Sequence, residues 1–158
     1  MEFTVGSRSI EIKFDYMTMY KVNRDLGSKG PDGSRNEDGV GALFLRVVDR
    51  NDSALVDLIK LFASKKAKAV SDEEAIKAIA DKMEDLGAES TESLFEALEE
   101  EMVDSGFFKE KVSKYLENLE LGLKYLKAKA ETAEDKAQAE LQVEQTEAQI
   151  GRLRNAIS

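Results

Sequence analysis

The chain contains no histidine, no cysteine and no tryptophan, and proline occurs once in its 158 residues. Histidine is the usual side chain for proton transfer near neutral pH, and together with cysteine it supplies most protein ligands of zinc and copper. A chain that lacks both can still catalyse reactions with carboxylates, lysines or serines, but its chemical repertoire is narrow. These absences therefore favour a binding or assembly protein over an enzyme.

The absence of cysteine also excludes a disulfide framework and fits a protein of the cytosol. No apolar run approaches the roughly 20 residues that are needed to span a bilayer. The first residues, Met-Glu-Phe-Thr-Val-Gly, lack the basic segment followed by an apolar one that marks a secretory signal. We therefore expect a soluble protein with no membrane partner.

The net charge of −9 is concentrated in one part of the chain, residues 71–104, which we call the acidic belt. The belt holds thirteen acidic and two basic side chains, whereas residues 1–70 hold ten acidic and twelve basic ones. Residues 105–158 hold nine of each sign. Because such a belt repels nucleic-acid phosphates, we expect no nucleic-acid partner. Two interpretations of the belt remain: solvated faces of two helices, or a docking surface for a basic partner.

The start of the chain has the pattern of two short strands. Apolar residues alternate with polar ones, as in half-buried strands, at Phe3, Val5, Ile10, Ile12 and Phe14. Gly6 and Ser7 lie between the two runs and suit the tight turn of a β-hairpin. The pattern predicts a hairpin that packs on other elements, because an isolated two-stranded hairpin is marginal in water.

The middle of the chain is predicted to form amphipathic helices at about residues 16–26, 40–48, 53–62, 72–86 and 91–105, where apolar residues recur at helical spacing. Residues 27–38 contain three glycines and the only proline, so we expect a mobile surface loop there. Ser71 and Glu74 form the sequence of a capping box. Gly87 and Gly106 are the expected stops of the last two helices.

The last third of the chain carries a heptad-like seam. Its positions alternate steps of three and four, and their identities fade from leucine to alanine along 116, 119, 123, 126, 130, 133 and 137. Small seam residues contribute little buried area, so this stretch alone would form a weak coiled coil. Two structures remain open: one long helix, or a helical hairpin in which Thr132 and Asp135 cap a second helix that runs to Ile157.

These elements together predict a mainly α (α+β) protein. It has an N-terminal β-hairpin, a multi-helix bundle and a long C-terminal helix or helical hairpin. We expect residues 1–120 to form one domain and residues 121–158 a C-terminal helical extension.

The sequence contains no motif for catalysis, cofactor binding or metal binding. It has neither a P-loop nor the glycine-rich fingerprint of dinucleotide-binding folds. The densest acidic cluster, residues 99–101 with Asp104, lies on the surface of one predicted helix, which would scatter the oxygen ligands that magnesium or calcium needs. We therefore predict no catalytic residue, no metal ligand and no cofactor.

A series of short segments carries the most specific signal in the chain. In order they are EFTVGSRSIEIKF at 2–14, a helix at 16–26, DGVGALF at 38–44, DSALVDLI at 52–59, SDEEAI at 71–76, LFEAL at 94–98 and SGFFK at 105–109. The order and spacing of these segments, rather than any one of them, resemble the tail assembly chaperones of long-tailed bacteriophages, in the form found in phages of Gram-positive hosts. The resemblance covers roughly residues 1–120.

The resemblance implies a non-enzymatic role in assembly. Members of this family bind the tape-measure protein while a phage tail is built, keep that long helical protein soluble and help to recruit tail-tube subunits. They act in the host bacterial cytoplasm and are absent from the finished virion. The implied partners are therefore the tape-measure protein and the tail-tube protein, with a homo-oligomer as a further alternative.

The residues themselves leave two rivals open. The chief one is a structural coiled-coil or oligomeric scaffold that associates through the C-terminal seam, and the other is an enzyme that uses carboxylates, which the missing histidines make the least favoured. As partner-binding residues we predict apolar side chains of two successive helices, Leu94, Phe95, Leu98, Phe107 and Phe108. Adjacent residues on a helix point about 100° apart, so one apolar stripe cannot easily bury both phenylalanines of the pair. We expect one in the core and the other at the helix junction or in a groove for a client helix or a neighbouring subunit.

Overall fold

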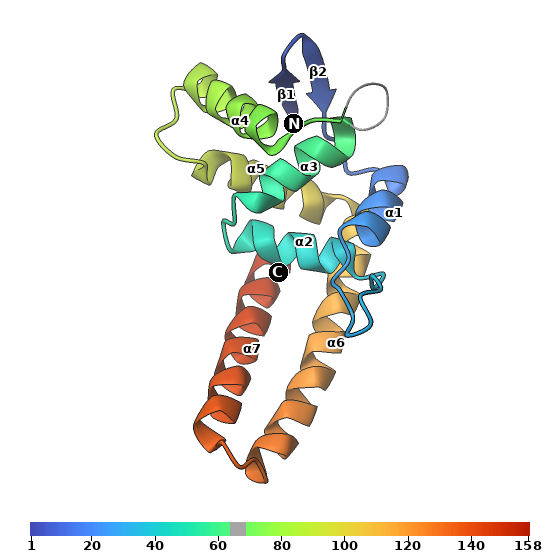
Figure 1. Cartoon of the computed structure of the whole chain (residues 1–158), viewed down its shortest axis with the longest axis vertical. Helices are drawn as coiled ribbons and strands as arrows, with labels where there is room; N and C mark the ends of the chain where they lie inside the picture. Colours follow the sequence, from blue (N-terminus) through green and yellow to red (C-terminus); the bar gives the residue numbers. More distant parts are fainter. Residues whose placement is uncertain (64–68) are drawn as a thin grey trace.

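A computed structural model describes residues 1–63 and 69–158, which form a helical body with a β-hairpin at one end and a helical hairpin projecting from the other (Figure 1). The predicted mainly α class with an N-terminal hairpin is confirmed, and the last third of the chain forms two helices rather than one. The elements are β1 (Glu2–Val5), β2 (Arg8–Glu11), α1 (Tyr16–Asp25), α2 (Gly39–Val48), α3 (Ser53–Ala63), α4 (Asp72–Leu86), α5 (Glu92–Asp104), α6 (Gly106–Glu131) and α7 (Lys136–Ile157). Within the described ranges, no helix combines the length and the apolar character that a membrane span requires.

The two strands pair antiparallel, with Phe3 opposite Ile10 and with Gly6 in the turn at a φ of 61°. Positive φ is the region that glycine adopts at no steric cost, which explains its place in this two-residue turn. The apolar face of the hairpin is buried, with β1 against α4 and β2 against α3. The alternating pattern therefore predicted the strands correctly, and the prediction that the hairpin packs on other elements of the chain is confirmed.

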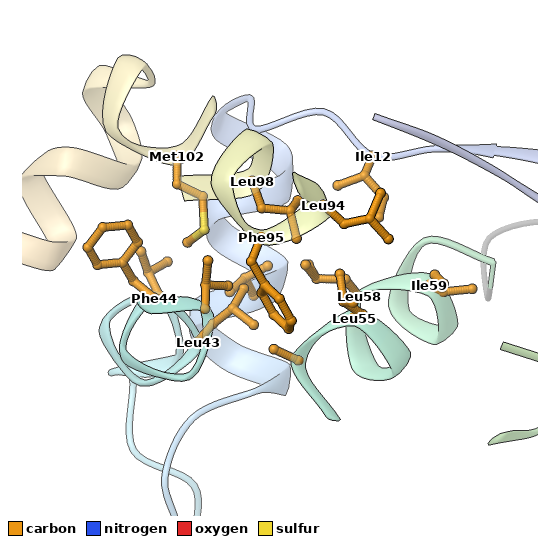
Figure 2. Close-up of a cluster of buried hydrophobic side chains, with 14 of the residues drawn as sticks. Ile12, Leu43, Phe44, Leu55, Leu58, Ile59, Leu94, Phe95, Leu98 and Met102 are labelled. Atoms are coloured by element: carbon orange, nitrogen blue, oxygen red, sulfur yellow. The ribbon is translucent and has the colours of Figure 1, made fainter. Parts of the chain in front are cut away.

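The core lies between α2, α3 and α5. Helix α2 contacts α1, α3, α5, α6 and α7, and six of its ten residues are buried. Figure 2 shows side chains from these helices converging: Leu43 and Phe44 from α2, Leu55, Leu58 and Ile59 from α3, and Leu94, Phe95, Leu98 and Met102 from α5, with Ile12 arriving from the hairpin. Local amphipathic patterns therefore meet in one continuous core.

The contact between α2 and α6 requires a glycine. A Cβ atom built on Gly41 would lie 2.1 Å from Cγ of Tyr115 in α6, well inside van der Waals contact. The backbone of α2 therefore lies directly on the ring of Tyr115. The same burial raises the pKa of the Tyr115 phenol, and the negative charge of Asp38 raises it further.

Residues 27–38, for which we expected a mobile loop, lie on the surface but hold a defined pattern of hydrogen bonds. The Asn36 N–H donates to the Ser28 carbonyl at 2.9 Å, and the Ser28 N–H donates to Oδ1 of Asp38 at 2.7 Å. Gly27 is buried, and a Cβ there would lie 1.8 Å from the Asn36 carbonyl oxygen. The glycine and proline content identified these residues as a surface loop, whereas hydrogen bonds between backbone groups and from backbone to side chains set its shape.

The predicted capping box is present, since the Ser71 hydroxyl accepts from the Glu74 N–H and the Glu74 carboxylate accepts from the Ser71 N–H. The predicted role of Gly106 was wrong, because this glycine opens α6 instead of ending α5. The break between the two helices lies at Ser105, which is extended. The Ser105 hydroxyl donates to the carbonyl of Phe14 at 2.7 Å, so a contact from a distant part of the chain fixes the end of α5.

Helices α6 and α7 form the helical hairpin that the sequence left open. The Asp135 side chain accepts from the Gln138 N–H at 3.1 Å and so caps α7, whereas Thr132 ends α6. Buried side chains occur near the body, at Leu116 of α6 and at Ile150 and Leu153 of α7. Towards the tip, the seam residues of both helices are at most partly buried, as their small size leads one to expect.

We predict opposite effects on stability for two glycine-to-alanine substitutions. Gly41→Ala should destabilise the protein by about 1–3 kcal/mol, because the added methyl group overpacks the contact with Tyr115. Gly122→Ala, at a position of α6 where nothing lies within 4 Å of an added Cβ, should stabilise it by up to about 1 kcal/mol through helix propensity. Thermal and urea denaturation measure both changes. Equal changes in the two variants would contradict the close approach of α2 to α6.

Candidate partner-binding surfaces

Four of the five predicted partner-binding residues lie inside the protein. Phe95, Leu98 and Phe108 have no exposed area, and Leu94 has almost none. The three residues of α5 point into the core towards α2 and α3 (Figure 2). Phe107 is 49% exposed. In this conformation, therefore, Phe107 is the one member of the set that a partner can reach.

The two adjacent phenylalanines at the start of α6 divide between the core and the surface. The ring of Phe108 packs edge-on against Phe14, with centroids 4.9 Å apart and an interplanar angle of 78°. The ring of Phe107 packs in the same manner against Tyr16 of α1, at 5.5 Å and 74°. Both are favourable aromatic geometries. The division follows from the angular offset of neighbouring helical residues.

Phe107 belongs to a larger exposed surface, which we call the aromatic patch: Tyr16, Met17 and Tyr20 of α1 with Phe107 of α6. Each of these side chains is about half exposed. The guanidinium of Arg24, one turn after Tyr20, lies 5.7 Å from the centroid of the Tyr20 ring. Clustered apolar and aromatic surface of this kind marks interaction sites on soluble proteins. The patch can bind an apolar helix face and offers phenol hydroxyls at its rim.

The three residues of the patch in α1 were not among the predicted partner-binding residues. The buried stripe of this helix, Thr18, Met19 and Val22, is enough to attach it to the core. Tyr16 and Tyr20 follow a second stripe at a spacing of four residues, so α1 is apolar on two faces. The core covers only one face of such a short helix. A second apolar face in the sequence could therefore have indicated a surface that remains exposed after folding.

A second surface is an open cavity of about 410 Å³ between α5 and the end of α7, which we call the acidic cavity. Part of the acidic belt faces it, since its lining consists of Arg50, Glu96, Glu99, Glu100, Val103, Asp104 and Ala156. Four carboxylates against one guanidinium give the cavity a negative potential, which attracts cationic groups.

Arg50 ties the turn after α2 to α5 beside this cavity. Its guanidinium pairs with Glu99 at 2.7 Å and with Glu92 at 2.9 Å. Burial alone would lower the pKa of Arg50, but the hydrogen bonds to Glu99 and Glu92 outweigh burial and hold the pKa above its usual value. The residue also adopts a φ of 55°, which is costly for a side chain other than glycine.

The carboxylates of the acidic cavity do not form a metal site. In the part of the chain that the structure describes, no three acidic side chains converge closely enough to hold an ion. Their arrangement along one helix instead offers a row of charges, which suits lysines or arginines of a partner.

The last turns of α7 close the core beside the acidic cavity. Ile150 and Leu153 are buried in the same cluster as the apolar residues of α2 and α5. Nε of Arg152 lies 2.6 Å from Oδ1 of Asp49, at the end of α2. Nη2 of Arg154 lies 2.6 Å from Oε1 of Glu120 in α6. This end of α7 is thus a basic amphipathic segment in an acidic surrounding.

The phenylalanine pair gives a direct test of the surface assignment. Phe108→Ala should destabilise the protein by about 3–5 kcal/mol, because it removes a fully buried ring. Phe107→Ala should change the stability by less than about 1 kcal/mol, since half of its ring already meets solvent. Urea denaturation followed by circular dichroism measures both values. Similar losses in the two variants would show that Phe107 is a structural residue and not part of an available surface.

In a comparison with known protein families, residues 2–117 match a family model described as phage tail assembly chaperone protein. No curated protein and no solved structure matches the chain. The matched region holds the whole aromatic patch and all of the acidic cavity except Ala156. It ends within α6, so the outer part of that helix and all of α7 lie beyond it.

Proposed function

The chain belongs to the phage tail assembly chaperone family, and we propose that it binds the tape-measure protein of a long-tailed phage while the tail is built. In this role it keeps the tape-measure protein soluble and helps to recruit tail-tube subunits. The observation that carries the proposal is the family match over residues 2–117. The resemblance of the opening hairpin and the following helices supports the same role.

The aromatic patch is the surface that we propose for first contact with the client. A long helical client presents apolar side chains at intervals of three and four residues, and such a stripe fits against exposed aromatic rings on a helical surface. Tyrosine and phenylalanine are enriched in protein interfaces because they bury a large area with few rotatable bonds. The net charge of −9 would keep the complex dispersed by mutual repulsion.

The proposed role is non-enzymatic and needs no cofactor. We place the protein in the host cytoplasm during assembly and outside the mature virion. We further propose that residues 1–120 act as the chaperone domain and that residues 121–158 are a helical extension. The end of the family match at residue 117 supports this division.

The rival function, a coiled-coil scaffold, draws less support from the fold. The outer part of α6 pairs with α7 of the same chain (Figure 1), so its seam is already occupied. Self-association of the chaperone remains part of our proposal, through surfaces other than this seam.

We predict that the chain keeps the tape-measure protein of the same phage soluble on co-expression and that the two proteins purify together. Tyr20→Ala combined with Phe107→Ala should weaken binding about tenfold or more, because interface aromatics dominate binding energy. Leu141→Ala, which removes an equally exposed apolar side chain from α7, serves as the matched control and should bind as the unaltered protein does. Soluble yield and a titration of affinity measure the effect.

Two results would contradict these proposals separately. If the tape-measure protein stays insoluble and does not bind the unaltered chain, the proposed function is wrong. If it binds, but the patch variant and the Leu141→Ala control bind equally well, the function stands and the aromatic patch is not its contact surface.

A further inference from the structure

We propose that the last turns of α7 occupy, within their own chain, a seat that a basic amphipathic helix of the client takes when it binds. The α7 seat is defined as the surface of α2, α5 and α6 that residues 149–157 cover. Helix α7 would thus act as a resident substitute for the client. This inference rests on the proposed function only for the identity of the client, because the exchange at the seat can be tested without it.

The seat is an apolar surface that already binds a helix. Ile150 and Leu153 are buried in the common core, and Ile157 is partly buried against it. Their spacing of three and then four residues is the anchor pattern by which amphipathic helices bind grooves. In Figure 1 the end of α7 lies against α2, and α7 also contacts α5.

The charges around the seat specify the kind of helix that it accepts. Asp49 and Glu120 lie on either side of the resident helix and pair with Arg152 and Arg154. The acidic cavity continues this negative surface, and Ala156 of α7 forms part of its wall. A replacement helix therefore needs apolar residues at positions i, i+3 and i+7, flanked by lysines or arginines. The acidic belt would then serve as a docking surface as well as a solvated one.

The resident helix buries a smaller share of its residues than the helices of the body do. Of its 22 residues two are buried, whereas α5 buries four of 13. Both of its arginine pairs are exposed to solvent, and exposed ion pairs add little stability. Towards the tip, its seam consists of small or partly exposed side chains. Helix α7 can therefore leave the seat while the core between α2, α3 and α5 persists.

The first experiment measures exchange at the seat with a labelled synthetic peptide of residues 136–157. The receptor is the full chain that carries Arg152→Glu and Arg154→Glu, in which Asp49 and Glu120 repel the resident helix. This variant should bind the peptide about tenfold more tightly than the unaltered chain does, because the fraction of molecules with an open seat rises. Fluorescence anisotropy gives the affinities.

The matched control is the full chain with Lys124→Glu and Lys136→Glu, two exposed lysines of the same hairpin that lie outside the seat. It has the same net charge as the arginine variant and should bind the peptide as weakly as the unaltered chain. If the unaltered chain, the arginine variant and the lysine variant all bind the peptide equally well, or if none of them binds it, the proposal that the seat exchanges its helix is wrong.

The second experiment locks the seat. Because the chain has no cysteine, Asp49→Cys with Arg152→Cys introduces the only two thiols, and a short bis-maleimide can join them. The same variant capped with N-ethylmaleimide is the control, and thermal denaturation checks that both forms are folded. The locked form should bind the tape-measure protein at least about tenfold more weakly than the capped form.

Other outcomes are equally decisive. Client binding that is the same in the locked and capped forms overturns the client as the occupant of the seat. Loss of self-association alone on locking would assign the seat to α7 of a second copy and would also overturn the proposal. If neither form nor the unaltered chain binds the tape-measure protein, the proposed function fails, while the peptide experiment still decides whether the seat exchanges its helix.

Discussion

The fold depends on the burial of α2 by the helices that surround it. This helix reads GVGALFLRVV and is apolar on nearly every side, so it is stable in water only when other elements cover it. Five helices do so. Two glycines make the enclosure tight, because a Cβ on Gly39 would lie 2.0 Å from the carbonyl oxygen of Val22 and one on Gly41 would meet the ring of Tyr115. The single charged residue, Arg46, reaches outward to Asp57 at 2.7 Å.

This constraint links the fold to the proposed function. Because other helices cover the apolar helix α2, the protein already contains surfaces that bind helices. Helix α7 occupies one of these surfaces. Ile150 and Leu153 come from beyond the region that defines the family, yet they complete the same core. Asp49, Glu120 and the acidic residues of α5 then give this surface a preference for positive charge, which the arginines of α7 satisfy. Binding a helical client would reuse an interaction that the chain makes with itself.

Much of the fold could be predicted from local patterns in the sequence. The alternation of Phe3, Val5 and Ile10 identified the hairpin, and Ser71 with Glu74 identified the start of α4, because such signals depend on neighbouring residues alone. The α6–α7 hairpin could not be distinguished from one long helix, since alanine seam positions fit both. The cap at Asp135, which the sequence offered for one of the two alternatives, is formed in the structure and decides between them.

The candidate surfaces were harder to predict. A periodic pattern shows that a helix has an apolar face, but not whether another element covers that face. Leu94, Phe95 and Leu98 were therefore indistinguishable in sequence from the lining of an open groove, although they are buried in the common core (Figure 2). Tyr16 and Tyr20 presented the opposite problem, because a second apolar stripe on α1 remains open after folding. Coverage depends on contacts between segments far apart in the chain, which a single sequence does not specify.

The proposal that a client helix replaces α7 in its seat can be tested by hydrogen–deuterium exchange of the full chain, alone and in complex with the tape-measure protein. This replacement predicts faster exchange of the amides of residues 149–157 in the complex, because α7 leaves the core. It also predicts undiminished protection of α2, because the client helix covers it in place of α7. Unchanged protection of residues 149–157 in a saturated complex would contradict the claim.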